Sequence, residues 1–283
     1  GVTVAVINLR NVQPKQKYLF VDDMRQEAKN INGYLADSPN VFVLRSSKPM
    51  NCGLPALVKG SQPTDGGSLI LEPHELERLM RESPDALEYV KKFLGSAEFI
   101  NGKDRYCLWI EPGQASHATN IPALAQRFER VSEMRRKSAK AATQSLSATP
   151  WRFGEIRYKP TSSIIVPRVS SEARDYIPMG FLGLDTVISD SAFAAYDAQP
   201  WVFALLTSRM HMVWTRAVAG ALETRIRYSN TIVYNNYPVP PLSDALKEQL
   251  TERALRVLDV REYHSELTLA DLYDPDKMPD NLR

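Results

Sequence analysis

Cysteine is scarce in this sequence, because its 283 residues contain only Cys52 and Cys107. Neither cysteine stands in a spacing typical of metal ligands, so the sequence indicates neither a disulfide framework nor a zinc site. Hydrophobic runs are also short: none reaches the roughly 20 residues of a membrane-spanning helix, and no leader sequence is recognisable. We therefore expect a cytoplasmic protein without membrane contact, in which both cysteines are small buried apolar side chains.

The sequence also lacks the motifs of several catalytic sites. The glycine-rich loop at residues 60–67 does not end in Gly-Lys-Ser/Thr, so it does not predict a nucleotide-binding P-loop. No glycine-rich cofactor loop stands between a predicted strand and a helix, and no Ser/His/Asp arrangement is indicated. Asp23 and the segment Glu27-Ala28-Lys29 have the residue types of a magnesium nuclease, but they lie too close together and the segment is predicted to be helical. We therefore predict no catalytic residue and no metal site in this segment.

Positive charge is concentrated in the middle of the chain, although the formal net charge is only +2. Residues 1–120 carry fourteen basic and fourteen acidic side chains. Residues 121–230 carry fifteen Lys and Arg against nine Asp and Glu, whereas residues 231–283 carry six against ten. An electrostatic footprint for phosphate groups is therefore expected in the middle third.

A short alternation of charges opens the segment Leu222–Asn236. Glu223, Arg225 and Arg227 are separated by single residues, so in an extended strand all three would project from one face. We call these three residues the charged comb. Arg can bind guanine O6 and N7 as a fork and Glu can accept a hydrogen bond from cytosine N4, so the comb fits base recognition; a salt-bridged solvent face is the alternative. Residues 231–234 have the β-branched and aromatic composition of a packed strand.

A second basic surface is predicted on the longest helix candidate, residues 121–143. Leu124, Phe128 and Val131 form its apolar stripe. Its other face holds six basic side chains, namely Arg127, Arg130, Arg135, Arg136, Lys137 and Lys140. Arg and Lys on such a helix can neutralise phosphates of a nucleic-acid backbone without reading sequence. A solvated charged face is the alternative.

Two predicted strands end in polar residues, which is where a rigid scaffold presents functional groups. Ser163–Pro167 is a strand that its proline confines to an edge or a bulge, and Arg168 follows it directly. Residues 186–191 form a second short strand that ends in Asp190 and Ser191. Both strand ends are therefore candidate binding positions.

The remaining elements are predicted to be structural. Residues 200–219 are apolar on most faces, which predicts a buried helix with His211 as a core histidine. Ser243 is expected to cap a final amphipathic helix. Val2–Leu9 and Lys17–Val21 read as two strands that pair as a hairpin. The sequence begins directly inside the first of these strands, which is typical of a fragment of a longer protein.

Long motifs are spread in order over nearly the whole chain, at Gly53–Gly67, Glu98–Gly102, Arg105–Trp109, Val166–Glu172, Thr207–Trp214, Tyr228–Pro238 and Leu269–Pro275. Together they resemble the C-terminal part of MmeI-like proteins, the type IIL restriction–modification enzymes and related class I S-adenosylmethionine-dependent DNA methyltransferases. The resemblance implies an α+β fold, with a mixed-sheet target recognition domain, amphipathic helices and a helical C-terminal segment. It also implies that residues 1–35 are the tail of an upstream methyltransferase domain, 36–204 the DNA target recognition domain, and 205–283 a C-terminal segment that carries the comb.

The resemblance implies that the chain recognises double-stranded DNA for an adenine-specific methyltransferase. The partners would be double-stranded DNA and an upstream domain of the same parent chain, which would bind S-adenosylmethionine and methylate the target adenine. Adenine methylation uses an Asn/Asp/Ser-Pro-Pro-Tyr/Phe motif around the flipped base. Residues 235–238, Asn-Asn-Tyr-Pro, contain similar residue types in another order and are not that motif. The sequence leaves open whether the parent also cuts DNA.

Positions that match base-reading positions of the family are Arg168, Asp190, Ser191, Glu223, Arg225 and Arg227. By the resemblance, Arg168 with Asp190 would read one base pair, Glu223 with Arg225 a second, and Arg227 with Ser191 a neighbouring one. A structural salt bridge between Arg168 and Asp190 is the alternative at the first pair. The alternative to DNA recognition belongs to another functional class. It is a protein-interaction subunit whose charged comb binds a partner protein.

Overall fold

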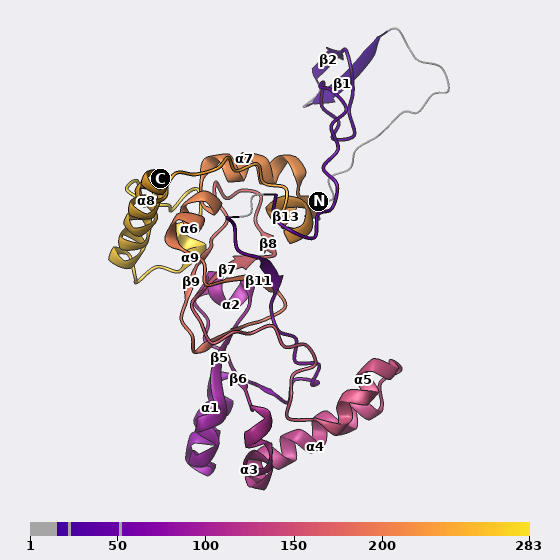
Figure 1. Cartoon of the computed structure of the whole chain (residues 1–283), viewed down its shortest axis with the longest axis vertical. Coiled ribbons are helices and arrows are strands. Elements are labelled where there is room, and N and C mark those ends of the chain that lie inside the picture. The colour runs from indigo at the N-terminus through magenta and orange to yellow at the C-terminus, as the bar shows by residue number, and fades with distance from the viewer. Residues whose placement is uncertain (1–15, 22–23, 51–52) are drawn as a thin grey trace.

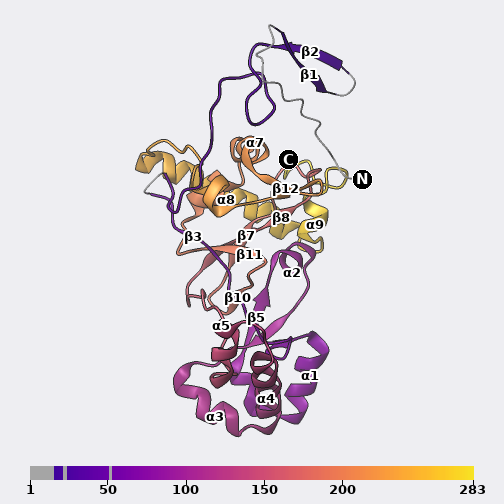
Figure 2. The same cartoon turned by 90° about the vertical axis from the view of Figure 1, so that its right-hand side faces the viewer.

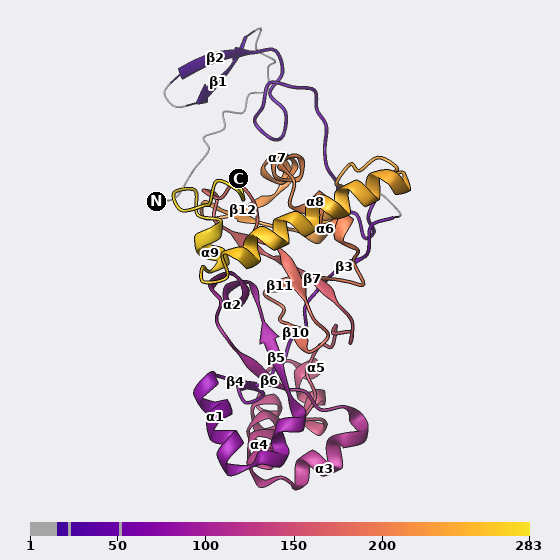
Figure 3. The same ribbon diagram turned by 90° about the vertical axis from the view of Figure 1, so that its left-hand side faces the viewer.

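The computed structural model describes residues 16–21, 24–50 and 53–283. These residues form an elongated molecule of the α+β class (Figure 1). A two-stranded hairpin stands at one end and a helix-rich lobe at the other (Figures 1 and 2). Between them lies a second sheet, and the long helix α8 (Asp244–Tyr263) runs diagonally above its strands in Figure 3. The α+β prediction is confirmed.

The helix-rich lobe is built around a mixed sheet in the order β10-β5-β6-β4. Its strands are β4 (Ile70–Leu71), β5 (Val90–Leu94), β6 (Tyr106–Leu108) and β10 (Thr186–Ile188). β10 runs parallel to β5, and the other neighbours are antiparallel. Because parallel strands end at the same sheet edge, this pairing brings the residues that follow β10 beside the residues that follow β5.

Short helices surround this sheet, namely α1 (Pro73–Glu82), η1 (Pro84–Tyr89), α2 (Ser96–Asn101), η2 (Pro112–Gln114), α3 (Ala115–Asn120), α4 (Pro122–Arg136), α5 (Ala141–Ser145) and η3 (Leu146–Ala148). The predicted apolar stripe of α4 lies in the lobe's core, where Leu124, Phe128 and Val131 are buried. Cys107 is buried there as well, and burial raises the pKa of its thiol. Cys52 lies outside the described residues.

The prediction of one helix over residues 121–143 is wrong, because α4 ends at Arg136 and a separate helix begins at Ala141. Two side-chain hydrogen bonds explain the break. The amide of Gln144 donates to the carbonyl oxygen of Ser138 at 2.8 Å, and the Ser138 hydroxyl accepts from the backbone N–H of Lys140 at 3.2 Å. Such local bonds compete with the backbone hydrogen bonds of a continuing helix.

The central sheet is antiparallel in the order β3-β11-β7-β9. Its strands are β3 (Leu57–Lys59), β7 (Ser163–Pro167), β9 (Gly180–Leu182) and β11 (Ala192–Tyr196). β7 is an inner strand, so the edge position, one of the two predicted alternatives, is wrong. Pro167 is tolerated because β9 pairs only with residues 163–165, and no neighbour on that side needs the missing N–H of the proline.

Three helices pack in one core with the central sheet, namely α6 (Pro200–Leu206), α7 (Arg209–Val218) and α8 (Asp244–Tyr263). The short helix α9 (Leu269–Leu272) belongs to a separate small cluster, in which Leu272 and Tyr273 are buried. The predicted buried helix over residues 200–219 is therefore two helices, and the Ser208 hydroxyl caps the second by accepting from the backbone N–H of His211. The Ser243 cap of α8 is confirmed, since its hydroxyl accepts from the backbone N–H of Leu246. α8 spans 20 residues and is longer than α4 with its 15.

A third sheet, in the order β12-β13-β8, carries the charged comb. Its strands are β8 (Val169–Ser170), β12 (Gly220–Leu222) and β13 (Arg225–Arg227). Residues 231–234, predicted as a strand, instead belong to the π-helix η4 (Asn230–Tyr234). Side-chain amides stabilise that turn, because Nδ2 of Asn236 donates to the carbonyl oxygens of Thr231 and Ile232 at 3.0 Å each.

The hairpin at the end of the molecule consists of β1 (Lys17–Val21) and β2 (Met24–Ala28), paired antiparallel. Lys17–Val21 is a strand as predicted, but its predicted partner Val2–Leu9 lies outside the described residues. Glu27 belongs to β2, so the helical prediction for the segment 27–29 is wrong. No helix of the described residues is long and apolar enough to cross a membrane.

The buried imidazole of His211 makes the stability of this core sensitive to pH. His211 is 1% exposed, its Nε2 lies 3.0 Å from Tyr228 Oη, and burial lowers its pKa from 6.5 to about 4. An unfolded chain protonates histidine at its ordinary pKa, so the folded state binds fewer protons between these two values. The contribution of His211 is therefore fully present above pH 6.5 and is lost as the pH falls toward 4.

We predict that His211 alone lowers the free energy of unfolding by about 2 kcal/mol between roughly pH 7 and pH 5. Urea unfolding of the wild type and of His211→Phe at both pH values measures this difference. The exposed His74, replaced by Asn, serves as the control and should leave the pH dependence unchanged. An equal pH dependence in wild type and His211→Phe would contradict the prediction.

Candidate nucleic-acid interface

The predicted base-reading residues come together because β7 continues directly into β8. Arg168 is the residue between the two strands. β8 pairs with β13, so that Val169 lies opposite Arg227 of the comb. The backbone N–H of Tyr228 donates to the carbonyl oxygen of Arg168 at 2.9 Å. On its other side, β7 pairs with β11, with Pro167 opposite Ala192. This pairing places the preceding Asp190–Ser191 turn beside Arg168.

The Arg168 side chain is half-buried and held in one orientation. Its Nη1 donates to the backbone carbonyl oxygen of Asp190 at 2.7 Å, and its guanidinium carbon lies 5.4 Å from the ring centroid of Phe193. The partner is thus the Asp190 backbone and not its carboxylate, so the predicted alternative, an Arg168–Asp190 salt bridge, is not present. A guanidinium has five N–H donors, and within the described residues no further hydrogen bond of this group is found.

The Asp190 carboxylate contacts a residue that the sequence analysis missed. Lys59, the last residue of β3, places its Nζ 3.3 Å from Asp190 Oδ2. Both side chains are about one-third exposed, with values of 37% and 35%. Exposed pairs of this kind contribute about 0–1 kcal/mol, so the carboxylate remains available to a ligand. The pairing of β3 with β11 and the bridge between Ser61 and Ser189 bring Lys59 here, and a sequence pattern carries no signal of either.

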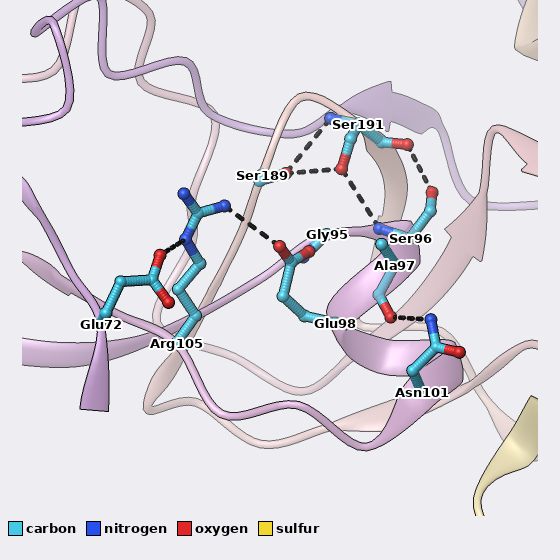
Figure 4. Close-up of polar contacts among 9 residues, drawn as sticks. All are labelled: Glu72, Gly95, Ser96, Ala97, Glu98, Asn101, Arg105, Ser189 and Ser191. Carbon is cyan, nitrogen blue, oxygen red and sulfur yellow. Dashed lines mark hydrogen bonds and ion pairs between the residues drawn. The ribbon is translucent and has the colours of Figure 1, made fainter. Parts of the chain in front are cut away.

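The Asp190–Ser191 turn is held by a group of hydroxyls, which Figure 4 shows. Ser191 Oγ lies 2.8 Å from Ser189 Oγ and accepts a hydrogen bond from the backbone N–H of Ser96 at 3.2 Å. The Ser96 hydroxyl donates to the Ser191 carbonyl oxygen at 2.5 Å. Ser191 is nevertheless exposed, so this group of bonds fixes a turn at the surface.

A charged group supports the start of α2 beside this turn (Figure 4). Arg105 Nη1 donates to Glu98 Oε1 at 3.1 Å, and Glu98 Oε2 accepts from the backbone N–H of Gly95 at 3.0 Å. Arg105 Nε lies 3.0 Å from Glu72 Oε1 and forms an ion pair with it, although its N–H makes no hydrogen bond within the described residues. A shallow depression lined by Glu98, Arg105, Asp190 and other residues borders the turn.

The charged comb lies on the β12–β13 hairpin. Arg225 and Arg227 are exposed on either side of the buried Ile226, as strand alternation predicts. Glu223 is not in an extended strand, because it takes a φ of +58° in the turn between Leu222 and Arg225. Its carboxylate Oε2 still lies 2.6 Å from Arg225 Nη2. Both side chains are exposed, so this pair is weak and can exchange for a ligand.

Two of the six basic residues predicted on one helix face over residues 121–143 do not lie on an exposed face, so their prediction as phosphate contacts is wrong. Arg127 is buried, and its guanidinium reaches Glu75 Oε1 at 2.8 Å and the carbonyl oxygen of Ser68 at 3.0 Å. Arg135 is 0% exposed. It donates to backbone carbonyl oxygens of five residues, Pro63, Thr64, Leu146, Thr149 and Arg152.

The other four basic residues, Arg130, Arg136, Lys137 and Lys140, are exposed. Lys137 pairs with Glu133 at 2.6 Å, and this pair lowers the pKa of the Glu133 carboxyl. α4 belongs to the lobe that lies at the opposite end of the body from β12 in Figure 3. A ligand that contacts both surfaces must therefore extend along the molecule.

The site has the features of a recognition surface. Guanidinium and carboxylate groups stand at strand ends and on a hairpin. The Ser96 hydroxyl accepts from the backbone N–H of Arg168, and the Arg168 side chain donates to the backbone carbonyl oxygen of Asp190. Within residues 16–21, 24–50 and 53–283 no group of three His, Cys, Asp or Glu side chains is placed to hold a metal ion. Fold and site together define a mixed α+β recognition domain followed by a helical segment.

Residues 37–241 match the family model of the MmeI target recognition domain, and residues 242–283 match that of the MmeI C-terminal domain. The chain therefore belongs to the MmeI target recognition domain family, which confirms the resemblance. The recognition-domain match extends past residue 204, where the sequence analysis ended that domain, and includes the charged comb.

Two known proteins are similar along almost the whole chain. DNA methyltransferase A of Bacillus subtilis (strain 168) is 41% identical over 284 residues, which is 100% of this chain and 32% of that protein. The structure of the type IIL restriction-modification enzyme MmeI in complex with DNA superposes with a TM-score of 0.91 at 32% identity, covering 96% of this chain and 37% of that one. The chain thus spans about a third of the length of either relative.

Because Arg135 bonds to five carbonyl oxygens, we predict that Arg135→Met lowers the free energy of unfolding by about 3–5 kcal/mol. The substitution leaves buried carbonyl groups without donors, which is costly. Arg136→Met, on the exposed side of the same helix, is the matched control and should cost less than about 0.5 kcal/mol. Chemical denaturation of both variants measures the difference. Equal losses would show that Arg135 is not a structural anchor.

Proposed function

We propose that this chain is the double-stranded DNA recognition module of an adenine-specific DNA methyltransferase that reads a defined sequence. The observation that carries the proposal is the surface formed by Arg168, Asp190 and the charged comb, within a fold that matches the enzyme MmeI, solved in complex with DNA, over 96% of this chain. Its guanidinium and carboxylate groups are the ones that distinguish base pairs in the major groove.

The geometry supports the reading of a G·C pair by Arg168 and Asp190. The backbone carbonyl of Asp190 directs the Arg168 guanidinium, which would donate to guanine O6 and N7. The Asp190 carboxylate, free of Arg168, would accept from N4 of the paired cytosine. Lys59 limits the electrostatic cost of a carboxylate near DNA, because its ammonium group stays beside that carboxylate.

The comb supports a second set of base contacts. Glu223 and Arg225, which touch each other at the hairpin tip, would read one G·C pair as carboxylate on cytosine and guanidinium on guanine. The pairing of β13 with β8 places Arg227 opposite Val169, the residue that follows Arg168. Arg227 would read a neighbouring base pair together with Ser191. Exposed Arg130, Arg136, Lys137 and Lys140 would contact phosphates and add affinity without sequence preference.

Catalysis and S-adenosylmethionine binding are proposed for another domain of the parent chain. The methyltransferase relative is about three times as long as this chain, which matches 32% of it. Residues 16–50 also expose large apolar side chains, with Phe20 71%, Phe42 65% and Leu44 76% exposed. Exposed apolar surface of this kind marks an interaction site, and the remainder of the parent chain is the partner that we propose for it.

Replacement of one comb residue tests the base-reading proposal. We predict that Arg225→Ala in the full-length enzyme reduces discrimination at one base position by about ten- to a hundredfold, the value of one bidentate contact. Methylation of a library with a randomised recognition site measures this preference. Arg253→Ala, on the exposed side of α8, is the control and should preserve every base preference.

Two other outcomes would contradict this proposal. Uniformly weaker methylation with unchanged base preferences would indicate that the comb is a salt-bridged surface. Unchanged methylation of DNA, together with loss of a protein partner, would favour the protein-interaction subunit.

A further inference from the structure

Ser96 makes hydrogen bonds to both strand ends that carry predicted base-reading residues. Its hydroxyl accepts from the backbone N–H of Arg168 at 3.1 Å and donates to the backbone carbonyl oxygen of Ser191 at 2.5 Å. Its own backbone N–H donates to Ser191 Oγ, as Figure 4 shows. A hydroxyl has one donor and two acceptor positions, so a single serine side chain can serve both strand ends at once.

The parallel pairing of β5 with β10 places Ser96 at this junction. Ile188 lies opposite Leu94, and the backbone N–H of Ser189 donates to the Leu94 carbonyl oxygen at 2.8 Å. The residues after β5 therefore run beside the residues after β10, and Ser96 begins α2 at that point. Ser96 thus belongs to the helix-rich lobe, while Arg168 ends a strand of the central sheet.

Gly95 packs closely against the side chains of Ser189 and Ser191 at the same junction. A Cβ atom at this position would lie 2.1 Å from Ser191 Oγ and 2.6 Å from Ser189 Oγ, which is closer than atoms can approach. The φ of Gly95 is −109°, which any residue adopts, so the lack of space and not the backbone conformation requires glycine. The turn therefore sits against Gly95 and is bonded to Ser96.

We propose that Ser96 is a positioning residue that sets the spacing between Arg168 and the Asp190–Ser191 turn, and so determines how strictly their base pair is read. This inference rests on the proposed function, in which Arg168 and Asp190 read one G·C pair. Such a double contact requires both side chains to be held within about half an ångström of the productive geometry. In this role Ser96 does not contact a base. It acts through its hydrogen bonds to the backbones of the two strand ends.

The test uses the full-length parent enzyme and methylation of a randomised site library. Arg168→Ala is measured first, because it identifies the base position that Arg168 reads. Ser96→Ala is then expected to reduce discrimination at that position by about three- to tenfold, the size of one or two lost hydrogen bonds. Gly95→Ala, which displaces the turn, is expected to reduce discrimination at the same base position. Ser96→Thr keeps the hydroxyl and is expected to retain the discrimination.

Ser243→Ala is the matched control, because it removes the serine hydroxyl that caps α8 and has no contact with the site. It is expected to alter no base preference, which separates positioning from a general loss of stability. The positioning role is overturned if Arg168→Ala reduces discrimination at one base position and both Ser96→Ala and Gly95→Ala leave the preference at that position unchanged. In that case the proposed function still stands.

The remaining outcomes also decide the question. If Arg168→Ala relaxes no position, base reading by Arg168 is refuted and the positioning role with it. Should Ser96→Ala fail to fold, Gly95→Ala decides: relaxation at the Arg168 position supports the inference, and unchanged preference overturns it.

Discussion

The structure depends on how Arg168 is held where the central sheet passes into the third sheet. Its backbone N–H donates to Ser96 Oγ, its carbonyl oxygen accepts from the backbone N–H of Tyr228, and its Nη1 donates to the Asp190 carbonyl oxygen. One residue thus ties together the start of α2, the end of β13 and the turn before β11. Two of these bonds reach the backbones of Tyr228 and Asp190, and the third reaches the hydroxyl of Ser96. The position of the site is therefore fixed by the fold.

Arginines serve two separate purposes in this domain, and burial distinguishes them. Arg127 and Arg135 are buried, and Arg261 of α8 joins Tyr273 to the carbonyl oxygen of Met179. Their guanidinium groups satisfy backbone carbonyls that would otherwise be buried without a donor. Arg225 and Arg227 are exposed, and exposed ion pairs are weak enough to be replaced by contacts with a ligand.

Local signals in the sequence predicted much of the fold. The alternation of Arg225 and Arg227 about Ile226 and the Ser243 cap each depend on neighbouring residues, and each is found where it was predicted, although Glu223 lies in a turn. Features that depend on distant residues were missed. Arg135 finds partners up to 72 positions away, so its position on the helix could not show that it is buried.

The same distinction applies to the candidate site. The resemblance supplied Arg168, Asp190 and Ser191, but Lys59 and Ser96 reach them only through strand pairing between distant segments. Residues 231–234 of the π-helix η4 were predicted as a strand, because their composition suits a strand and the Asn236 side-chain amide that stabilises the turn gives no periodic signal.

The central claim is that Arg168 donates to a guanine in the major groove, and base analogues test it most directly. Each guanine of the recognised site is replaced in turn by 7-deazaguanine, which lacks the N7 acceptor, or by inosine, which lacks only the minor-groove amino group. The account predicts that one 7-deazaguanine slows methylation by the full-length enzyme about tenfold, that inosine there does not, and that Arg168→Ala removes the effect of the analogue. If the analogue slows the Arg168→Ala enzyme as much as the wild type at every position, the account is contradicted.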